Sequence, residues 1–558
     1  MKTRISLLTT LLLLTCATWA QNPKWFKKAR KSQVTVIMHN AQDEIKQAQG
    51  YYVDENGTVV TEYDLVAGAV RGTIVDADGK EHSITGIQGA NSLYNVVRFE
   101  TDALKTAMPA QASSSQQVSQ LVYIMPISSN DKKVVCQLDT IAELQEFDEA
   151  KYPYYKLSRS IDSRYAGCPV FNEAGELIGH IQMSANGDDQ PAFVLGIQYS
   201  KSLTITALDA NNADLNATSI PKVLPDDENQ ASTFLFLMNK QNEQAFENQV
   251  KAFIEKFPTN TTGYIQLAEL KVRKKDYKAA EDVYTQAMTK QTENEDELHH
   301  SFAKQLYQLA LKGEKPAEGW DMERALQEAS AAYSCNPIAL YTSLEGHCLY
   351  ALGRYNEAFD KFIDVNKSNL RSAENFVYAA QCKQMAKAPI EEVYALQDSA
   401  VNCYTKPYPA EAAPYIYLRA TSLAEMKKFR EAVADMNEFE HLTSANVSAK
   451  FYYEREQMEI QCKQFQNALN DIERAASLDP KEPLYSAEEA ALNYRVGQLE
   501  EAVIAAKEAI KRDDTFADAH RILGVCLRDL GKSSEAKKSL QRAIELGDEA
   551  AKTILEKM

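Results

Sequence analysis

Hydrophobic residues follow two different spacings along the chain. From about residue 33 to 203 apolar and polar positions alternate, as in 34–38 and 70–75, and this period of two predicts half-buried β-strands. Beyond about residue 230 the apolar residues recur every three or four positions, which predicts amphipathic helices. The pattern therefore predicts an all-β part followed by an all-α part.

Turn residues divide the first part into many short strands. Residues 50–53 and 94–99 are two further predicted strands, and turns that end in glycine lie at 54–57, 76–79 and 172–175. A polar segment rich in Ser and Gln, 108–117, separates two halves of similar size. Many short strands with glycine turns indicate a barrel or sandwich. The central break favours two small barrels joined by a linker.

The helical part repeats itself about every 34 residues. Ala468, Ala502 and Ala536 recur at that spacing, and each is followed two helical turns later by another alanine. Small residues at fixed positions let two helices pack closely, and a stack of helix pairs buries surface that one pair leaves exposed. This period predicts a solenoid over 231–558. The Asn- and Asp-rich segment 207–230 is the predicted linker before it.

The first twenty residues have the pattern of a cleaved signal peptide. Lys2 and Arg4 precede an apolar run over 5–14, and small residues at positions 18 and 20 place the predicted cut after Ala20. The run is shorter than a membrane span. Cys16 follows a threonine instead of the Gly, Ala or Ser that normally precedes a lipidated cysteine, so a lipoprotein is the less favoured alternative. The mature protein is expected in the periplasm or outside the cell.

Charge and composition narrow the possible partners. The net charge is −17, with 45% hydrophobic and 25% charged residues, as in a folded chain. This charge disfavours nucleic acid and an anionic membrane surface, because both are bound through clustered Lys and Arg. Eight cysteines follow Cys16 without a C-x-x-C pair, and the eight histidines have no metal-type spacing. Buried thiols are therefore predicted, with no metal and no cofactor.

Three separated segments resemble bacterial trypsin-like serine proteases. Residues 50–64 are similar to the strand, turn and strand that end in T-x-x-H in that family, and 94–97 resemble the strand that carries the family's Asp. Residues 166–179 resemble S-G-[GS]-P-V-F-N-x-x-G-x-x-x-G, which begins at the nucleophile. The three occur in the family's order. The resemblance implies a trypsin-like double β-barrel over 21–206.

The matched positions lack the residues that such a protease uses. Asp64 stands at the family's His position, Asn95 at its Asp position and Ala166 at its nucleophilic Ser position. Arg164 replaces the glycine whose backbone N–H helps to form the oxyanion hole. A serine protease needs a hydroxyl, an imidazole and a carboxylate together. The sequence therefore predicts an inactive triad.

Cys168 offers an alternative nucleophile two residues after Ala166. A catalytic thiol needs a base, usually His, that generates the thiolate. His39, His82 and His180 are the histidines of the β part, and none stands at the T-x-x-H position. A protease that uses Cys168 or an unrecognised site is the alternative to a small buried thiol.

The helical part resembles the tetratricopeptide repeat. Besides the alanine period, 275–280, 353–358 and 427–432 match the turn and the start of the second helix of that repeat. The resemblance implies a superhelical solenoid of about eight or nine units, a capping helix at the end, and a concave face that binds a protein or peptide. The candidate anchors on first helices, for which packing between helices is the alternative role, are Tyr415, Tyr417, Arg419, Tyr452 and Arg455.

These inferences combine into one expected organisation: a signal peptide at 1–20, a catalytically degenerate double barrel at 21–206, a linker at 207–230 and a tetratricopeptide solenoid at 231–558. The expected function is that of an exported, non-catalytic adaptor or scaffold whose solenoid recruits a protein or peptide. The alternatives are an active protease of the same fold and a purely structural role for the barrels.

Overall fold

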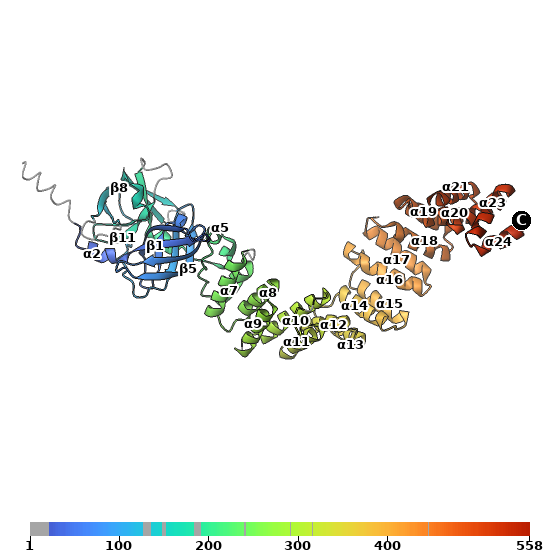
Figure 1. Cartoon of the computed structure of the whole chain (residues 1–558), viewed down its shortest axis with the longest axis horizontal. Coiled ribbons are helices and arrows are strands. Elements are labelled where there is room, and N and C mark those ends of the chain that lie inside the picture. The colour runs from blue at the N-terminus through green and yellow to red at the C-terminus, as the bar shows by residue number, and fades with distance from the viewer. Residues whose placement is uncertain are drawn as a thin grey trace, which may run out of the picture. The chain divides into compact units, whose positions relative to one another are not determined.

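The computed structural model describes residues 22–126, 135–147, 152–182, 191–238, 242–290, 292–314, 316–444 and 446–558. The predicted signal peptide, 1–20, lies outside these residues. The chain separates into two units, Met1–Leu298 and His299–Met558. Strands and the first helices make up the first unit, and helices make up the second (Figure 1).

The β part forms two closed antiparallel barrels, as expected for a trypsin-like double barrel. The strand order is β1-β2-β3-β6-β5-β4 in the first and β10-β11-β12-β9-β8-β7 in the second. Figure 1 shows β1 and β5 on the first barrel and β8 and β11 on the second. The strands of the first barrel are β1 Gln33–Asn40, β2 Ile45–Tyr52, β3 Val59–Thr61, β4 Ala69–Val75, β5 Glu81–Asn91 and β6 Val96–Thr101. Those of the second are β7 Leu121–Ile124, β8 Gln137–Phe147, β9 Tyr152–Ser160, β10 Pro169–Phe171, β11 Leu177–Gln182 and β12 Pro191–Gly196.

Glycine is required in the predicted turn at 54–57. Gly57 has a φ of 87°, in the left-handed region that side chains other than glycine rarely adopt. A Cβ at Gly57 would lie 2.4 Å from the carbonyl oxygen of Ala103. The turn between β2 and β3 therefore depends on the absence of a side chain at this position.

One apolar cluster joins the two barrels. Tyr51 and Val60 of the first barrel and Phe171 and Leu195 of the second belong to it, and all four side chains are fully buried. Full burial of each such side chain stabilises the fold by roughly 1.5–3 kcal/mol. The cluster holds the barrels against each other, so residues of both can meet at one site.

The predicted linker is ordered on the first barrel. It contains η5 Ala207–Asn211 and α5 Ala213–Asn216, followed by an extended segment. The N–H of Gly68 donates to the carbonyl of Ala217 at 2.7 Å. Farther along, a parallel bridge joins Ile87 of β5 to Lys222. The segment thus adds a short edge to the barrel.

The same segment holds the first long helix, α7 Glu243–Lys256. The Oε1 of Gln249 accepts the backbone N–H of Lys222, and its Nε2 donates to the carbonyl of Lys222, both at 2.8 Å. Gln249 is fully buried. Two hydrogen bonds from one buried amide therefore fix α7 to the edge of the barrel.

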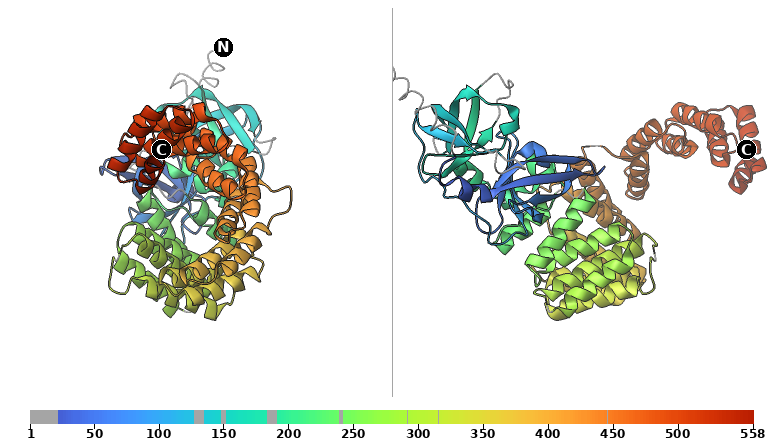
Figure 2. Two further views of the ribbon diagram at one scale, coloured as in Figure 1. Left: turned by 90° about the vertical axis from the view of Figure 1, so that its right-hand side faces the viewer. Right: turned by 60° about the vertical axis from the view of Figure 1, so that its left-hand side comes forward.

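Helices make up the rest of the described chain, many of them paired in hairpins as expected for a tetratricopeptide solenoid, and Figure 2 gives two further views of them. The helices are α6 Glu228–Leu237, α8 Thr261–Arg273, α9 Tyr277–Thr289, α10 Glu295–Leu311, α11 Met322–Cys335, α12 Ala339–Ala351, α13 Tyr355–Asn366, α14 Ala373–Met385, α15 Ile390–Val401, α16 Ala413–Glu425, α17 Phe429–Leu442, α18 Ala449–Gln461, α19 Phe465–Leu478, α20 Pro483–Arg495, α21 Leu499–Arg512, α22 Ala517–Asp529, α23 Ser533–Glu545 and the terminal α24 Glu549–Glu556.

The repeated small residues lie where helices touch. Ala468, Ala502 and Ala536 are all fully buried. In α22, a Cβ on Gly524 would lie 2.6 Å from Cγ of Leu540 in α23. Close packing within a hairpin therefore depends on small side chains, which explains the alanine period. Between the two helices of a hairpin, one residue takes a positive φ; these residues are Lys275, Gly353, Lys387, Lys427, Lys463, Gly497 and Gly531.

Three further observations concern membrane-spanning helices, metal sites and cysteines. No described helix is long and apolar enough to cross a membrane. Among the described residues, no group of three or more His, Cys, Asp or Glu is arranged to hold a metal ion. The cysteines Cys136, Cys168, Cys348, Cys382 and Cys526 are buried thiols.

Candidate functional site

The structure places Asp64 and Asn95 side by side. Asp64 lies in the short helix α3 Tyr63–Val66, and Asn95 precedes β6. The Oδ1 of Asn95 accepts the backbone N–H of Asp64 at 2.9 Å. Asn95 has a φ of 44°, a conformation that Asn tolerates better than most residues. The residues at the family's His and Asp positions are therefore in contact, through an amide and not through a charged pair.

Glu62 is a third member of this group, which the motifs of the sequence do not single out. The Nδ2 of Asn95 donates to its Oε1 at 3.4 Å. Burial, helped by the nearby charge of Asp64, raises the pKa of Glu62 to about 7. A carboxyl that titrates near neutrality thus lies beside the two matched positions. The only sequence signal is its place in the segment that resembles T-x-x-H.

On the second barrel, the matched nucleophile position follows a tight turn, η4 Ser163–Tyr165. The N–H of Arg164 donates to Oδ1 of Asp162 at 2.9 Å, and the N–H of Ala166 donates to the carbonyl of Ser163 at 3.0 Å. In a serine protease, the two backbone amides at such positions bind the oxyanion. Here both are already hydrogen-bonded within the turn.

Gln49 of β2 connects this turn to the first barrel. Its Oε1 accepts a hydrogen bond from Sγ of Cys168 at 3.1 Å, and its Nε2 donates to the carbonyl of Arg164 at 3.3 Å. Gly167 has a φ of 72°, and a Cβ there would lie 3.1 Å from the carbonyl oxygen of Gln49 and 3.4 Å from Cγ of Glu62. Residues on both sides of Ala166 therefore pack against the first barrel. The sequence carried no signal for the role of Gln49.

Cys168 is fully buried. Burial, with a smaller contribution from the charge of Glu62, raises the pKa of its thiol far above the ordinary value. The hydrogen-bond acceptor of the thiol is an amide oxygen, which removes no proton. The arrangement therefore favours a neutral thiol, whereas nucleophilic attack requires the thiolate.

The three histidines of the β part are engaged elsewhere. His39 Nδ1 lies 3.0 Å from Oδ1 of Asp43, and His82 Nδ1 lies 3.2 Å from Oδ1 of Asp102. His180 is buried, its Nδ1 lies 2.9 Å from the hydroxyl of Tyr51, and burial lowers its pKa to about 4. Each ring is thus held by a partner other than Cys168.

The predicted anchors of the solenoid have partners inside the solenoid. Arg419 donates to both carboxylate oxygens of Asp435 at 2.8 Å and to Asp398 at 2.8 Å. Arg455 donates to both oxygens of Asp471, at 2.6 and 2.8 Å. Their side chains are 14% and 6% exposed, so both guanidinium groups connect helices and little of either reaches solvent.

The predicted tyrosines also make internal contacts. The hydroxyl of Tyr452 donates to Glu440 at 2.8 Å, and the ring is buried. The hydroxyl of Tyr417 donates to Glu454, and the ring of Tyr415 stacks on Tyr404 with 5.8 Å between centroids. The rings of Tyr415 and Tyr417 are half-buried, so part of each faces solvent.

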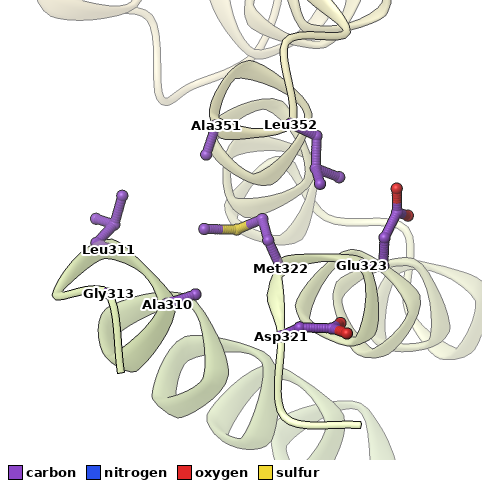
Figure 3. Close-up of a pocket in the computed structure, with 8 residues that line it drawn as sticks. All are labelled: Ala310, Leu311, Gly313, Asp321, Met322, Glu323, Ala351 and Leu352. Carbon is purple, nitrogen blue, oxygen red and sulfur yellow. The ribbon is translucent and has the colours of Figure 1, made fainter. Parts of the chain in front are cut away.

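A cavity of about 440 Å³ opens where α10 and α12 end and α11 begins. Leu311, Met322 and Leu352 supply apolar side chains, and the acids Asp321 and Glu323 also line the cavity (Figure 3). The Asp321 carboxylate points away from Met322, and its Oδ1 accepts the N–H of Arg324 at the start of α11. Leu311 is 59% exposed. An apolar wall beside two carboxylates suits a side chain with an apolar stem and a cationic head, as in Lys or Arg. No pattern in the sequence indicates this cavity.

Family comparisons agree with the two parts of the fold. Residues 48–179 match the model of the trypsin-like peptidase domain, and residues 517–546 match the model of the tetratricopeptide repeat. The chain therefore contains a trypsin-like peptidase domain and tetratricopeptide repeats. The human DnaJ homolog subfamily C member 7 is 33% identical over 84 residues, which cover 15% of this chain and 17% of that relative. The chain thus spans under a fifth of that relative.

Solved structures similar to this chain include a serine endoprotease and a tetratricopeptide protein. The serine endoprotease from Yersinia pestis is 14% identical, with a TM-score of 0.27, and the match covers 32% of this chain and 65% of the endoprotease. YrrB, described as a TPR protein with an unusual peptide-binding site, is 18% identical, with a TM-score of 0.31, and the match covers 35% of this chain and 98% of YrrB.

Proposed function

We propose that this chain is an exported, non-catalytic adaptor that carries an inactive protease-like domain and recruits a protein or peptide through its solenoid. The observation that carries the proposal is the engagement of the backbone amides of Arg164 and Ala166 within their own turn. An oxyanion binds only to donors that point at it, and stabilisation by one such donor is typically worth about 10²–10³ in rate.

The triad-like positions support the same function. Asn95 accepts the backbone N–H of Asp64, but its amide carries no charge that would stabilise an imidazolium. Ala166 has no hydroxyl, and Cys168 is buried with a raised pKa. The site therefore offers a polar framework without a nucleophile that is both activated and accessible.

The solenoid provides the recruiting surface in this proposal. Because the heads of Arg419 and Arg455 are bound to acids of the solenoid, a partner finds its anchors elsewhere. The cavity beside Leu311 and Met322 is the strongest candidate, since a Lys or Arg of the partner would bury its stem there and place its charge near the exposed Glu323. Tyr415 and Tyr417 offer half-exposed rings as further contacts.

The catalytic side of the proposal is tested with a peptide library. The protein starting at Gln21 and its Cys168→Ala variant are each incubated with diverse peptides, and new termini are identified by mass spectrometry. Cys136→Ala, which removes a second buried thiol, is the matched control. We expect no cleavage by any of the three. Cleavage by the parent that Cys168→Ala abolishes and Cys136→Ala preserves would refute the proposal.

The recruiting side is tested by cross-linking capture from envelope extract. The baits are the parent protein, a Met322→Glu variant, and a Met385→Glu variant as the control at an exposed methionine outside the cavity. We expect the parent and the control to enrich the same protein and the Met322→Glu variant to lose it. Equal capture by all three would place the recruiting surface elsewhere.

A further inference from the structure

The segment that leads into β1 is amphipathic, and its apolar side is bound to the second barrel. The ring of Trp25 lies 5.2 Å from that of Phe171, and its Nε1 donates to the carbonyl of Glu173 at 3.1 Å. Phe26 and Ala29 are buried. A Cβ at Gly175 would lie 2.4 Å from the Trp25 ring, so the turn is shaped to receive it. The orientation of the segment is therefore fixed.

Polar bonds hold the segment at both ends. The Oδ1 of Asn22 accepts the backbone N–H of Cys136 at 3.0 Å, and Nε2 of Gln33 donates to the carbonyl of Met125 at 2.7 Å. Both partners belong to the part of the chain that forms the second barrel. Side chains on the outer face of the segment are thus presented from a rigid support, which lowers the entropic cost of binding a ligand.

That outer face is strongly basic. Lys24, Lys27, Lys28 and Lys31 are exposed, and none of the four takes part in an ion pair among the residues that the structure describes. From Gln21 the chain has no carboxylate before Asp43. The net charge of −17 disfavours anionic partners for the chain as a whole. Acidic residues farther from this face than a Debye length of about 10 Å are, however, screened by salt. The local excess of positive charge therefore acts on its own.

A cavity of about 600 Å³ lies at this basic face. Lys24, Lys27, Arg30 and Lys31 line it, with Asp78 of the turn between β4 and β5 as the one carboxylate among the residues described there. Phe26 contributes an apolar wall. The ammonium groups of Lys24, Lys27 and Lys31 repel one another around this cavity, and an anion of multiple charge relieves that repulsion.

We infer that this cavity binds a phosphate-bearing anion. A phosphate group presents several oxygens over a small volume, and each accepts a charge-assisted hydrogen bond from an ammonium or guanidinium group. A single carboxylate would satisfy fewer of the three lysine ammonium groups. The phosphate group belongs either to a lipid head group or to a soluble polyphosphate, and the two sources share the chemistry of the site. The inference is independent of the function proposed for the solenoid.

The test uses the whole protein from Gln21 onward. The site variant combines Lys24→Gln, Lys27→Gln and Lys31→Gln. The matched control combines Lys537→Gln, Lys538→Gln and Lys552→Gln, which removes the same charge from exposed positions of the last helices. Circular dichroism establishes that both fold. Calorimetry with tripolyphosphate probes the soluble source. Co-sedimentation with phosphatidylglycerol–phosphatidylcholine vesicles, against phosphatidylcholine alone, probes the lipid source.

We expect saturable binding of one probe, weakened about tenfold or more in the site variant and unchanged in the control variant. Binding should also weaken as salt is raised, because the contacts are ionic. Absence of binding to both probes at low salt would overturn the inference. Equal weakening in the two variants would also overturn it, because the effect would then come from net charge and not from this cavity.

Discussion

Arg455 of α18 and Asp471 of α19 form a bidentate ion pair in which both side chains are 6% exposed. Arg419 and Asp435 repeat this relationship, also 16 residues apart, and Glu345 with Lys361 reverses its sign at the same separation. Three hairpins therefore join their two helices through an ion pair at the same sequence separation.

The Arg455–Asp471 pair should be costly to break on one side. Arg455→Met leaves the carboxylate of Asp471 buried without its cation, and such a loss typically costs about 3–5 kcal/mol. We expect a lower midpoint of urea unfolding, followed by far-ultraviolet circular dichroism. Lys450→Met is the control: Lys450 is exposed, and its pair with Glu454 is worth under about 1 kcal/mol. Adding Asp471→Leu to Arg455→Met should recover most of the loss; a double variant as unstable as the single one would contradict the explanation.

Two buried acids of the same helix should make the solenoid less stable as pH rises. Burial raises the pKa of Glu456 to about 8, with added repulsion from Glu488, Glu459 and Asp471. Burial likewise raises the pKa of Glu459 to about 8, with Asp471 and Glu440 opposing its ionisation and Arg455 favouring it. Both side chains are buried. Near neutral pH the folded state therefore holds protons that the unfolded state releases.

The sign of the pH dependence follows from these raised values. Below about pH 4.3, the pKa of Glu in an unfolded chain, both carboxyls are protonated in the folded and in the unfolded protein. The stabilisation of the fold by these two protonated carboxyls is then complete. Between about pH 5 and 8 each carboxyl lowers the free energy of unfolding by up to about 1.4 kcal/mol per pH unit. We expect the melting temperature to fall over this range, and less steeply in Glu456→Gln and Glu459→Gln. Parallel pH profiles of the parent and both variants would contradict this assignment.

Cys168 should be unreactive in the native state. Its burial and raised pKa both suppress the thiolate that reacts with iodoacetamide. Cys335, which is exposed, is the internal control. We expect peptide mapping to find Cys335 labelled within the native protein and Cys168 labelled only after denaturation. Labelling of Cys168 in the native protein at a rate comparable to that of Cys335 would support the alternative that Cys168 is the nucleophile of a protease.

The spacing of hydrophobic residues and the residues typical of turns predicted the fold well, because both are local properties of the sequence. The alternation around Val36 and the glycine at position 57 indicate strand and turn, and the alanines at 468, 502 and 536 indicate the hairpin contacts. The partners of single side chains are a tertiary property. Gln49 meets Cys168 across 119 positions of sequence, so no local pattern announces the contact.

For Arg455, residue type and position suggest a partner outside the chain, whereas the structure shows partners inside the solenoid. Tyr and Arg on first helices are typical of binding surfaces, so the sequence predicts Arg455 as an anchor for a protein or peptide. The acids that hold it, Asp471 and Glu440, stand on the second helices of two successive hairpins, 16 and 15 residues away. Only the stacking of hairpins brings both acids to one guanidinium group.

Restoring the three triad residues should not restore proteolysis. The variant combines Asp64→His, Asn95→Asp and Ala166→Ser. The amide of Arg164 still donates to Asp162 in that variant, and a missing oxyanion donor typically costs about 10²–10³ in rate. We expect hydrolysis of a fluorogenic peptide series at the background rate. Adding Asp162→Ala and Arg164→Gly frees the turn and should raise the rate; substantial activity without these two changes would contradict the role given to the turn.

The joint between the first barrel and the first long helix should depend on Gln249. Its amide supplies both hydrogen bonds to the backbone of Lys222, and removing it leaves a buried N–H and a buried carbonyl unsatisfied. Each such group costs about 1–3 kcal/mol. In Gln249→Ala we expect faster limited proteolysis between residues 217 and 227 while the barrels stay intact. Gln244→Ala, at an exposed position of the same helix, is the control and should leave the cleavage rate unchanged. Equal rates in the parent and Gln249→Ala would mean that the parallel bridge at Ile87 suffices to hold the joint.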